Sequence, residues 1–347
     1  MKNLLRKMRR TAFEFVLPDG RTVGDVVLQP LLREHLRPLV VDVGARNGMQ
    51  MLPSGYAQNA RLIGFEPNPE EHRKLVSKTT DAHKINAPIP VYQNEVYHPY
   101  ALWDSAGTHQ FHITTGPGAC TLMGPTITEV TEHMYMDYPD SRREKSFEQL
   151  HTKVKESIQV PCCKLDDILG SDEVCDFLKL DVEGAELRCL RGAERTLSEK
   201  RILFIYTEFV ALPFYAEHCT LGDLHVFLAG KKYRLLDMDR GHQSYRREAR
   251  DLPESADRRL LHAGDAFFCL DPDTNTLSPR DKQRMAALCL IFEFNSFALS
   301  LLREAGLTGA DDLNRIEQVI SSTYTVNRLK KIWAQLPTTI ARILRGH

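Results

Sequence analysis

Short apolar runs, each followed by a helical pattern, constrain the fold of this chain more than any other feature. The clearest run is LVVDVG at residues 39–44, which is rich in valine and ends in glycine. A run that is apolar on both faces is typical of a strand inside a parallel sheet. Further runs lie at residues 61–66, 91–96, 176–181, 201–209, 233–239 and 265–271. Strands that alternate with helices predict an α/β fold.

Composition and charge narrow the class of protein. The 347 residues include 45 Lys and Arg against 46 Asp and Glu, so no field of one sign favours a nucleic-acid partner. No apolar run reaches the roughly 18 residues of a transmembrane segment, and no secretory core follows the basic N-terminus. We therefore expect a cytoplasmic protein. Its eight cysteines are expected to be reduced thiols rather than disulfides or zinc ligands.

The pattern along the chain predicts three parts. Residues 1–36 form a lead-in, residues 37–272 the α/β domain and residues 278–347 a C-terminal helical extension. A polar, helix-like insertion at 125–160 is either plain surface or a lid over a substrate pocket. The extension is either a cap on the core, a surface for homo-oligomerisation or a peripheral contact with an anionic membrane.

Two further segments of the domain have readable patterns. Residues 109–115 alternate between polar and apolar side chains, which is typical of a half-exposed hairpin strand. Residues 182–197 carry Ala185, Leu190 and Leu197 at helical spacing, which predicts one amphipathic helix.

The strongest local motif is the turn after the first run, VVDVGARNG at residues 40–48. Gly44 and Gly48 allow the chain to turn sharply and to approach a ligand closely. Their G-x-x-x-G spacing is weak by itself and could be an accidental turn. Glu66 strengthens it, because a carboxylate 22 residues later can accept both ribose hydroxyls of an adenosine cofactor. Asp42 adds a carboxylate in a buried strand, which is costly unless it is paired or faces a polar ligand.

The residues of this turn distinguish between cofactors. A dinucleotide needs bare backbone facing two phosphates, whereas this turn carries Arg46 and Asn47. Asp42 and the turn can instead receive an ammonium and a carboxylate. S-adenosylmethionine has that amino-acid end as well as an adenosine for Glu66, so we expect it as the cofactor. A nicotinamide-dependent oxidoreductase on the same type of sheet is the alternative enzyme.

A second motif is DFLKLDVEGAEL at residues 176–187. Lys179 and Asp181 project to the same side of their strand, and Glu183 and Glu186 follow in the turn. Glu208 ends the next predicted strand. One interpretation is structural: Lys179 and Asp181 form an ion pair, and the glutamates are favoured near the N-terminus of the following helix. The other is a catalytic cluster, because open α/β sheets bind ligands at the carboxyl ends of their strands.

These motifs resemble those of the FkbM family of class I S-adenosylmethionine-dependent methyltransferases. The resemblance rests on VVDVGARNG, on LIGFEPNPEEHRKL (62–75), on ALWDSAGTHQFHIT (101–114), on VPCCKLDDIL (160–169), on DFLKLDVEGAELRCLRGAERTL (176–197), and on YTEF and GDAFFCLDP (206–209, 264–272). It implies a Rossmann-like seven-stranded methyltransferase sheet, flanked by helices, whose last strand is antiparallel. It also implies O-methylation, often of sugar hydroxyls on glycans or secondary metabolites.

The resemblance and the motifs together give the predicted sites. The resemblance implies that Asp42, Gly44 and Gly48 line the methionine end of the cofactor and that Glu66 binds the ribose. It also implies that Ala101, Leu102 and Asp104 lie near the adenine. The full predicted cofactor-binding set is Asp42, Gly44, Ala45, Asn47, Gly48, Glu66, Pro67, Asn68, Ala101, Leu102 and Asp104. The predicted catalytic residues are Lys179, Asp181, Glu183 and Glu208.

The expected reaction is methyl transfer to a hydroxyl oxygen of a small molecule or glycan, in which positioning supplies most of the catalysis. The hydroxyl must lose its proton, so we expect a base among Asp181, Glu183, Glu208 or a histidine of the insertion such as His133. The three carboxylates would also suit Mg²⁺, but spacing alone does not define a metal site and we assign none. A non-catalytic scaffold acting through residues 278–347 is the non-enzyme alternative.

Overall fold

The computed structural model divides into two compact units. We call the first the sheet unit; it holds residues 37–50 and 57–277. The second, the helical unit, holds the described residues before position 37, residues 51–56 and the described residues from 278 onward. The residues that the structure describes are 27–29, 31–32, 37–85, 87, 89–124, 126–136, 141–246, 252, 256, 258–306, 311, 313–314 and 316–321.

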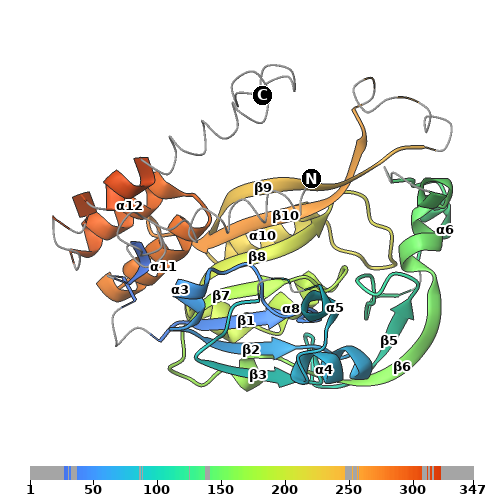
Figure 1. Cartoon of the computed structure of the whole chain (residues 1–347), viewed down its shortest axis with the longest axis horizontal. Helices are drawn as coiled ribbons and strands as arrows, with labels where there is room; N and C mark the ends of the chain where they lie inside the picture. Colours follow the sequence, from blue (N-terminus) through green and yellow to red (C-terminus); the bar gives the residue numbers. More distant parts are fainter. Residues whose placement is uncertain are drawn as a thin grey trace, which may run out of the picture. The chain divides into compact units, whose positions relative to one another are not determined.

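A seven-stranded sheet is the framework of the sheet unit (Figure 1). Its strands are β1 (Leu39–Val43), β2 (Arg61–Phe65), β3 (Asn94–His98), β7 (Cys175–Leu180), β8 (Ile202–Val210), β9 (Tyr233–Ser244) and β10 (Leu260–Leu270). They lie in the order β3-β2-β1-β7-β8-β10-β9. β10 is antiparallel to β8 and β9, and the other neighbouring pairs are parallel. The predicted α/β fold is confirmed, although β3 begins three residues later than predicted.

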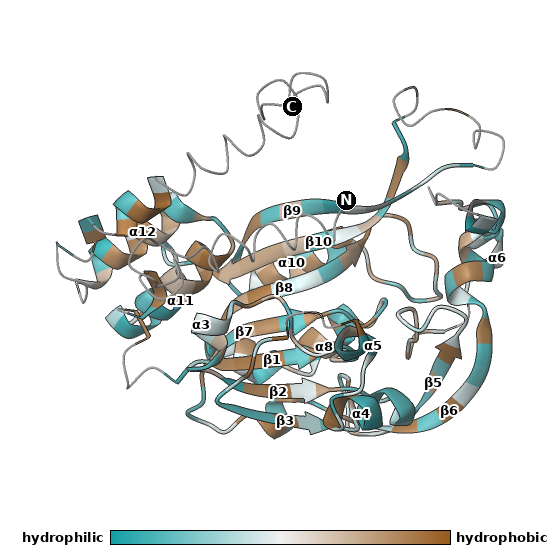
Figure 2. Ribbon diagram, viewed as in Figure 1, coloured by the Kyte–Doolittle hydropathy of each residue, from teal (hydrophilic) through white to brown (hydrophobic). Residues whose placement is uncertain are grey.

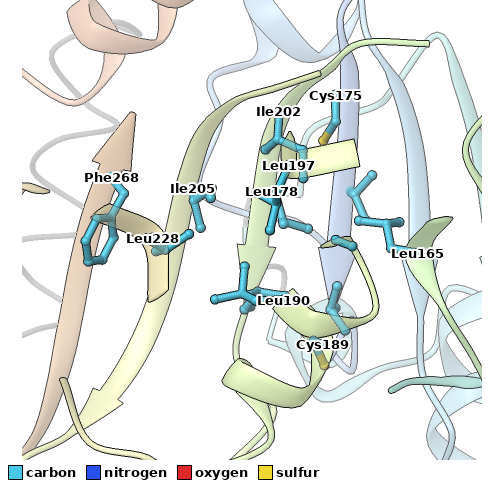
Figure 3. Packing of buried hydrophobic residues seen from close by; sticks show 14 of the residues in the cluster. Leu165, Cys175, Leu178, Cys189, Leu190, Leu197, Ile202, Ile205, Leu228 and Phe268 are labelled. Atoms are coloured by element: carbon cyan, nitrogen blue, oxygen red, sulfur yellow. The ribbon is translucent and has the colours of Figure 1, made fainter. Parts of the chain in front are cut away.

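The central strands are buried on both faces, as their unbroken apolar runs predict. Every residue of β1 and β7 is buried, and brown dominates much of β1 in Figure 2, whereas the flanking helices α4 (Pro69–Val76) and α5 (Asp81–Lys84) are largely hydrophilic. Figure 3 shows the core on one face, where Leu178 and Ile205 of the sheet meet Leu228 of helix α10 (Leu221–Gly230).

The segment after β7 forms two short helices instead of the single helix that its pattern predicts. They are α8 (Glu186–Arg191) and α9 (Glu194–Ser198). Gly192 ends α8, and a side chain at this position would overlap the backbone oxygen of Trp103. The chain therefore bends where Gly192 meets another backbone, while Leu190 and Leu197 still face the core.

A smaller sheet of three strands accompanies the main sheet. It contains β4 (Ala101–Leu102), β5 (Gly107–Thr114) and β6 (Val154–Cys163). β6 lies between β4, to which it is parallel, and β5, to which it is antiparallel. The predicted hairpin strand corresponds to β5. Its partner β6 corrects the prediction of a helical insertion over 154–160, because a strand with one solvated face has an outer row of polar residues.

In the rest of the insertion, the described residues 126–136 and 141–153 form short turns rather than long helices. They are α6 (Thr128–Thr131), the 3₁₀ turn η1 (Ser141–Glu144) and the π turn η2 (Glu148–Thr152). Met134 and Phe147 are buried in a cluster with Phe214 and Tyr215 of the segment that follows β8. Tyr135 also forms a backbone bridge with Tyr245. The described part of the insertion is thus packed against other segments of the sheet unit.

The helical unit contains α11 (Pro279–Ile291) and α12 (Asn295–Ala305), which pack on each other. Ser278 caps α11 by accepting a hydrogen bond from the Asp281 N–H, and Pro279 occupies the first turn, as is typical of a helix start. Helix α3 spans Ser54–Ala57, of which residues 54–56 are assigned to the helical unit. The predicted helix after residue 321 lies outside the described residues, as does most of the 1–36 lead-in. Among the helices of the described ranges, none combines the length and apolarity needed to cross a membrane.

Candidate active site

The glycine turn after β1 brings two strand ends into direct contact. Gly44 has a φ of +80°, and a side chain there would overlap the backbone oxygen of Asp181 at the end of β7. The N–H groups of Gly44 and Ala45 both donate to the Phe65 carbonyl, at 3.1 and 3.0 Å. Gly48 has a φ of +76° and donates to the Ala45 carbonyl at 2.7 Å. The turn therefore depends on glycine for both its backbone angles and its close approach.

Lys179 connects the two carboxylates of the central strands. It lies opposite Asp42 in the register of β1 and β7, and its Nζ is 3.0 Å from Asp42 Oδ1 and 3.4 Å from Asp181 Oδ2. Burial raises the pKa of Asp42, and the Lys179 ammonium opposes this shift. Asp42 is 1% exposed and Asp181 is much more open. Lys179 therefore neutralises Asp42 first, which the sequence did not indicate.

Glu66 lies directly after β2 and is 5% exposed. Its Oε1 accepts a hydrogen bond from the Asn68 N–H at 2.9 Å. Burial raises the pKa of Glu66 to about 7, against the lowering effect of that hydrogen bond. The half-buried Pro67 links the two residues. Near neutral pH the Glu66 carboxyl group is therefore close to half ionised, and hydrogen-bond donors of a ligand would favour its ionised form.

Two predicted cofactor residues have structural partners of their own. The Asn68 side chain caps α4 by accepting from the N–H groups of Glu70 and Glu71, at 3.0 and 3.3 Å. Asn47, in contrast, has a buried Oδ1 with no hydrogen-bond partner among the residues that the structure describes. A buried acceptor without a donor is uncommon, so Asn47 marks a place where a ligand group could donate.

Arg46, which helped to distinguish the cofactors, is engaged with two acids. Its guanidinium lies 3.1 Å from Glu71 Oε2 and 2.9 Å from Asp81 Oδ2. These partners tie the glycine turn to α4 and α5. A ligand carboxylate would therefore be received by the backbone of the turn rather than by a free Arg46.

The residues predicted near the adenine lie in and after β4. Leu102 is buried in the main core, and its carbonyl accepts from the Cys189 thiol at 3.2 Å. Ala101 is buried in the cluster of the smaller sheet. Asp104 forms an ion pair with Arg188 of α8 at 2.7 Å. These contacts place residues 101–104 against α8 and the smaller sheet.

Three of the four predicted catalytic residues come together. One carboxylate oxygen from each of Asp181, Glu183 and Glu208 lies within 4.8 Å of the others. We call these residues the carboxylate cluster. Burial raises the pKa of both Glu183 and Glu208, and the neighbouring carboxylates raise them further. His133, the histidine predicted as an alternative base, is exposed, and its Nε2 lies 3.1 Å from Oε1 of the neighbouring Glu132.

Several residues around the cluster were not predicted. The segment 116–121 runs from Arg46 to the carboxylate cluster. At one end, a side chain on Gly118 would lie 4.0 Å from the Arg46 guanidinium. At the other end, the Thr121 hydroxyl donates to the Glu183 carbonyl at 2.8 Å. Between them, the Ala119 carbonyl accepts from the Tyr215 hydroxyl at 3.3 Å. The Gly-Pro-Gly sequence at 116–118 indicates a turn, but nothing in the sequence indicates what the turn touches.

Glu186 supports the turn beneath the cluster. Its Oε1 accepts from the N–H groups of Val182 and Gly184, at 3.1 and 3.3 Å. Burial nevertheless raises the pKa of Glu186 from 4.5 to about 7. Between about pH 4.5 and pH 7, Glu186 therefore keeps its proton in the folded protein and has lost it in the unfolded chain.

This difference predicts that the protein becomes less stable as pH rises from about 4.5 to about 7. We expect the free energy of unfolding to fall by about 2 kcal/mol more in the wild type than in Glu186→Gln over this range. Gln can still accept both N–H groups but does not titrate. Urea unfolding at several pH values measures the difference, and equal slopes for the two proteins would contradict the shift.

A mainly parallel seven-stranded sheet with an antiparallel last strand and a glycine turn after β1 agrees with the Rossmann-like sheet that the resemblance implies for S-adenosylmethionine-dependent methyltransferases. The methyltransferase FkbM domain matches residues 42–235, more than half of the chain. The chain therefore belongs to the FkbM methyltransferase family. It is an enzyme that uses S-adenosylmethionine, and this sets aside the nicotinamide and scaffold alternatives.

Solved structures of methyltransferases also align with the chain at low similarity. Magnesium protoporphyrin IX methyltransferase from Synechocystis PCC 6803, solved with bound S-adenosylmethionine, is 12% identical over 77% of this chain and 96% of its own, with a TM-score of 0.31. A TehB-like S-adenosylmethionine-dependent methyltransferase from Corynebacterium glutamicum is 13% identical over 78% and 97%, with a TM-score of 0.28. None of the curated proteins matches the chain. The assignment thus rests on the family match.

Proposed function

We propose that this methyltransferase moves the methyl group of S-adenosylmethionine to a hydroxyl oxygen of a sugar. The observation that carries the proposal is the carboxylate cluster of Asp181, Glu183 and Glu208, whose oxygens converge within 4.8 Å at the ends of β7 and β8. Carboxylates accept hydrogen bonds and do not donate them when ionised. A sugar offers several adjacent hydroxyl donors, which suits three converging acceptors.

The chemistry requires a base at the acceptor. As the new C–O bond forms and the C–S bond breaks, the hydroxyl proton must leave; it passes to a carboxylate, and the products are a methyl ether and S-adenosylhomocysteine. Catalytic bases work best when their pKa is near the operating pH. Burial and mutual repulsion raise the pKa values of Glu183 and Glu208 in that direction. Asp181 adjoins both and is also held by Lys179.

We assign the cofactor to the glycine turn and the end of β2. Asn47 Oδ1, a buried acceptor without a donor, fits the ammonium of the cofactor. The backbone N–H groups of Arg46 and Asn47 would receive its carboxylate, because those of Gly44, Ala45 and Gly48 already donate to carbonyl groups of the protein. Glu66 would receive its ribose hydroxyls. Asp42 then acts through Lys179, as a buried partner that fixes the lysine beside Asp181.

The same three oxygens could hold a divalent cation that acidifies the hydroxyl. Hard cations such as Mg²⁺ prefer carboxylate oxygens, and the cluster supplies three of them. Chelator-treated protein, assayed with and without added Mg²⁺, separates this mechanism from a metal-free base. Activity that returns only with Mg²⁺ supports the cation, and full activity after chelation supports the base.

Acceptor profiling tests the proposed function. The full chain is incubated with S-adenosylmethionine and a panel of sugars and glycans, each paired with an analogue in which one hydroxyl is already methylated. We expect S-adenosylhomocysteine to form with a sugar and to be lost with the matched analogue. Transfer to amines or thiols in a parallel panel, with none to hydroxyls, would overturn the proposal.

Cys120 offers a separate test of the cofactor position. Of the eight cysteines, only Cys120 and Cys163 are partly exposed. Burial raises the pKa of the Cys120 thiol, and the charges of Glu66 and Arg46 act on it more weakly and in opposite directions. We expect S-adenosylhomocysteine to slow alkylation of Cys120 severalfold, because alkylation requires access to the thiol. In urea-unfolded protein, S-adenosylhomocysteine should leave the alkylation rate of Cys120 unchanged. Mass spectrometry measures the rates with and without the ligand, and no slowing in the folded protein would contradict the assigned position.

A further inference from the structure

We propose that Thr121 is a positioning residue that holds Glu183 in the carboxylate cluster. This inference rests on the proposed function, in which Glu183 faces the acceptor. Thr121 lies 62 residues before Glu183 and belongs to none of the motifs that define the family resemblance. It contacts the backbone of Glu183 and not its carboxylate, so its effect on the reaction would be indirect.

The backbone of Glu183 needs such support. Its φ is +54°, in the left-handed region that residues other than glycine rarely adopt. Its side chain also converges with two other carboxylates, and their mutual repulsion favours any movement that separates them. A non-glycine residue in this conformation persists only where its surroundings hold it, and such residues gather at active sites.

The Thr121 hydroxyl supplies the support from one side. Thr121 is 2% exposed. Its Oγ1 donates to the Glu183 carbonyl at 2.8 Å and accepts from the Met123 N–H at 3.0 Å. Both roles of the hydroxyl are therefore used, and its proton is directed at the Glu183 carbonyl.

The anchor itself is held by the smaller sheet. The Thr121 N–H donates to the His112 carbonyl at 3.1 Å, and the His112 N–H donates to the Thr121 carbonyl at 2.8 Å. His112 belongs to β5. On the other side of the turn, a side chain on Gly184 would approach within 2.7 Å of the His218 ring. The turn at 183–184 is thus confined between the Thr121 hydroxyl and His218.

The chemistry of the hydroxyl makes the proposal specific. Serine at position 121 keeps the donor and acceptor, whereas valine keeps the shape and removes both. If Thr121 only fills space, Thr121→Val should behave like the wild type. If it positions Glu183, Thr121→Val should loosen the cluster and Thr121→Ser should restore it.

Terbium luminescence can report the geometry of the cluster without an identified acceptor. Tb³⁺ binds oxygen ligands, and its luminescence is titrated with the full chain of each variant; the cluster signal is the part removed by Glu183→Gln. We expect Thr121→Val to weaken Tb³⁺ binding at the cluster by about ten- to a hundredfold, the usual effect of losing a group that orients metal ligands. Thr121→Ser should stay close to the wild type. The affinity for S-adenosylhomocysteine, measured by calorimetry, should not change in either variant.

The outcomes separate this inference from the proposed function. Wild-type protein that fails to bind S-adenosylhomocysteine would contradict the assigned cofactor site and leave the Tb³⁺ comparison as the test of Thr121. Equal Tb³⁺ affinities for Thr121→Val and the wild type would overturn the role of Thr121, as would a wild type without a cluster signal. Failure of Thr121→Ser to restore binding would also overturn it.

A stability cycle covers the case in which Thr121→Val folds poorly. Glycine adopts a positive φ without support, so Glu183→Gly removes the need for the anchor. We expect Thr121→Val to lower the Tm less in the Glu183→Gly background than in the wild type. An equal loss of Tm in both backgrounds would show that the Thr121 hydroxyl does not hold the turn, and would overturn the inference.

Discussion

Asp181→Asn should lower turnover by roughly 10²–10⁴-fold, the usual contribution of a positioned base, while the Tm and the affinity for S-adenosylhomocysteine change little. The structure gives the reason for the small effect on stability. Lys179 has a second and closer partner in Asp42, at 3.0 Å, so removing the Asp181 charge does not leave the lysine unpaired. Turnover with an acceptor from the profiling and thermal unfolding should be measured on the same preparation.

Asp42→Asn is the matched control for this experiment. Asp42 is almost fully buried and lies in the middle of the β1–β7 register. Removing its charge leaves the Lys179 ammonium facing the more open carboxylate of Asp181, and breaking a buried pair in this way costs about 3–5 kcal/mol of stability. We therefore expect a lower Tm for Asp42→Asn. If Asp181→Asn kept full activity per folded molecule, the role of base would pass to Glu208 or Glu183.

Glu66→Ala should weaken the affinity for S-adenosylhomocysteine by about ten- to a few hundredfold, because it removes two charge-assisted hydrogen bonds of about 1.5–3 kcal/mol each that water partly replaces. Glu70→Ala is the control. It removes the same charge four residues away, from an exposed side chain paired with Lys74. Calorimetry on folded protein measures both. An unchanged affinity for Glu66→Ala would show that the ribose lies elsewhere.

The pH dependence of the same affinity gives Glu66 a second readout. Its pKa is about 7 in the protein without ligand, and ribose hydroxyls bind the ionised form better. Binding should therefore weaken as pH falls below about 7, because the carboxyl must first lose its proton. Glu66→Gln should show a flatter profile over the same range, since the amide does not titrate.

The fold could be predicted where a pattern reflects burial on both faces. β1, β2, β7 and β8 carry unbroken apolar runs, and each prediction agrees with the observed strand to within one residue at either end. β6 could not be predicted, because a strand with one solvated face can carry charged residues such as Lys155 and Glu156, which are equally typical of a helix. The break between α8 and α9 depends on the backbone of Trp103, 89 residues from Gly192, and no local pattern contains that information.

Some contacts of the candidate site could also be predicted from the sequence, and others could not. Asp181 and Glu208 could be expected to meet because parallel neighbours such as β7 and β8 end at one edge of the sheet. The partners of Arg46 could not be predicted, since Glu71 and Asp81 reach it from two helices whose placement depends on the packing of the whole unit. Thr121 was missed for a related reason: a single hydroxyl in a turn carries no periodic pattern.

The contact between Gly44 and Asp181 also limits how this protein can diverge. A side chain at position 44 would overlap the backbone of position 181, and no choice of residue at 181 relieves an overlap with a backbone oxygen. Gly230, at the end of α10, has open space around the position of a side chain. Over evolutionary time, Gly44 should therefore be replaced rarely and Gly230 more often, although both lie at the end of a secondary-structure element. Changes of acceptor preference in descendants of this chain would then accumulate in the segments that face the acceptor and leave the junction of β1 and β7 as it is.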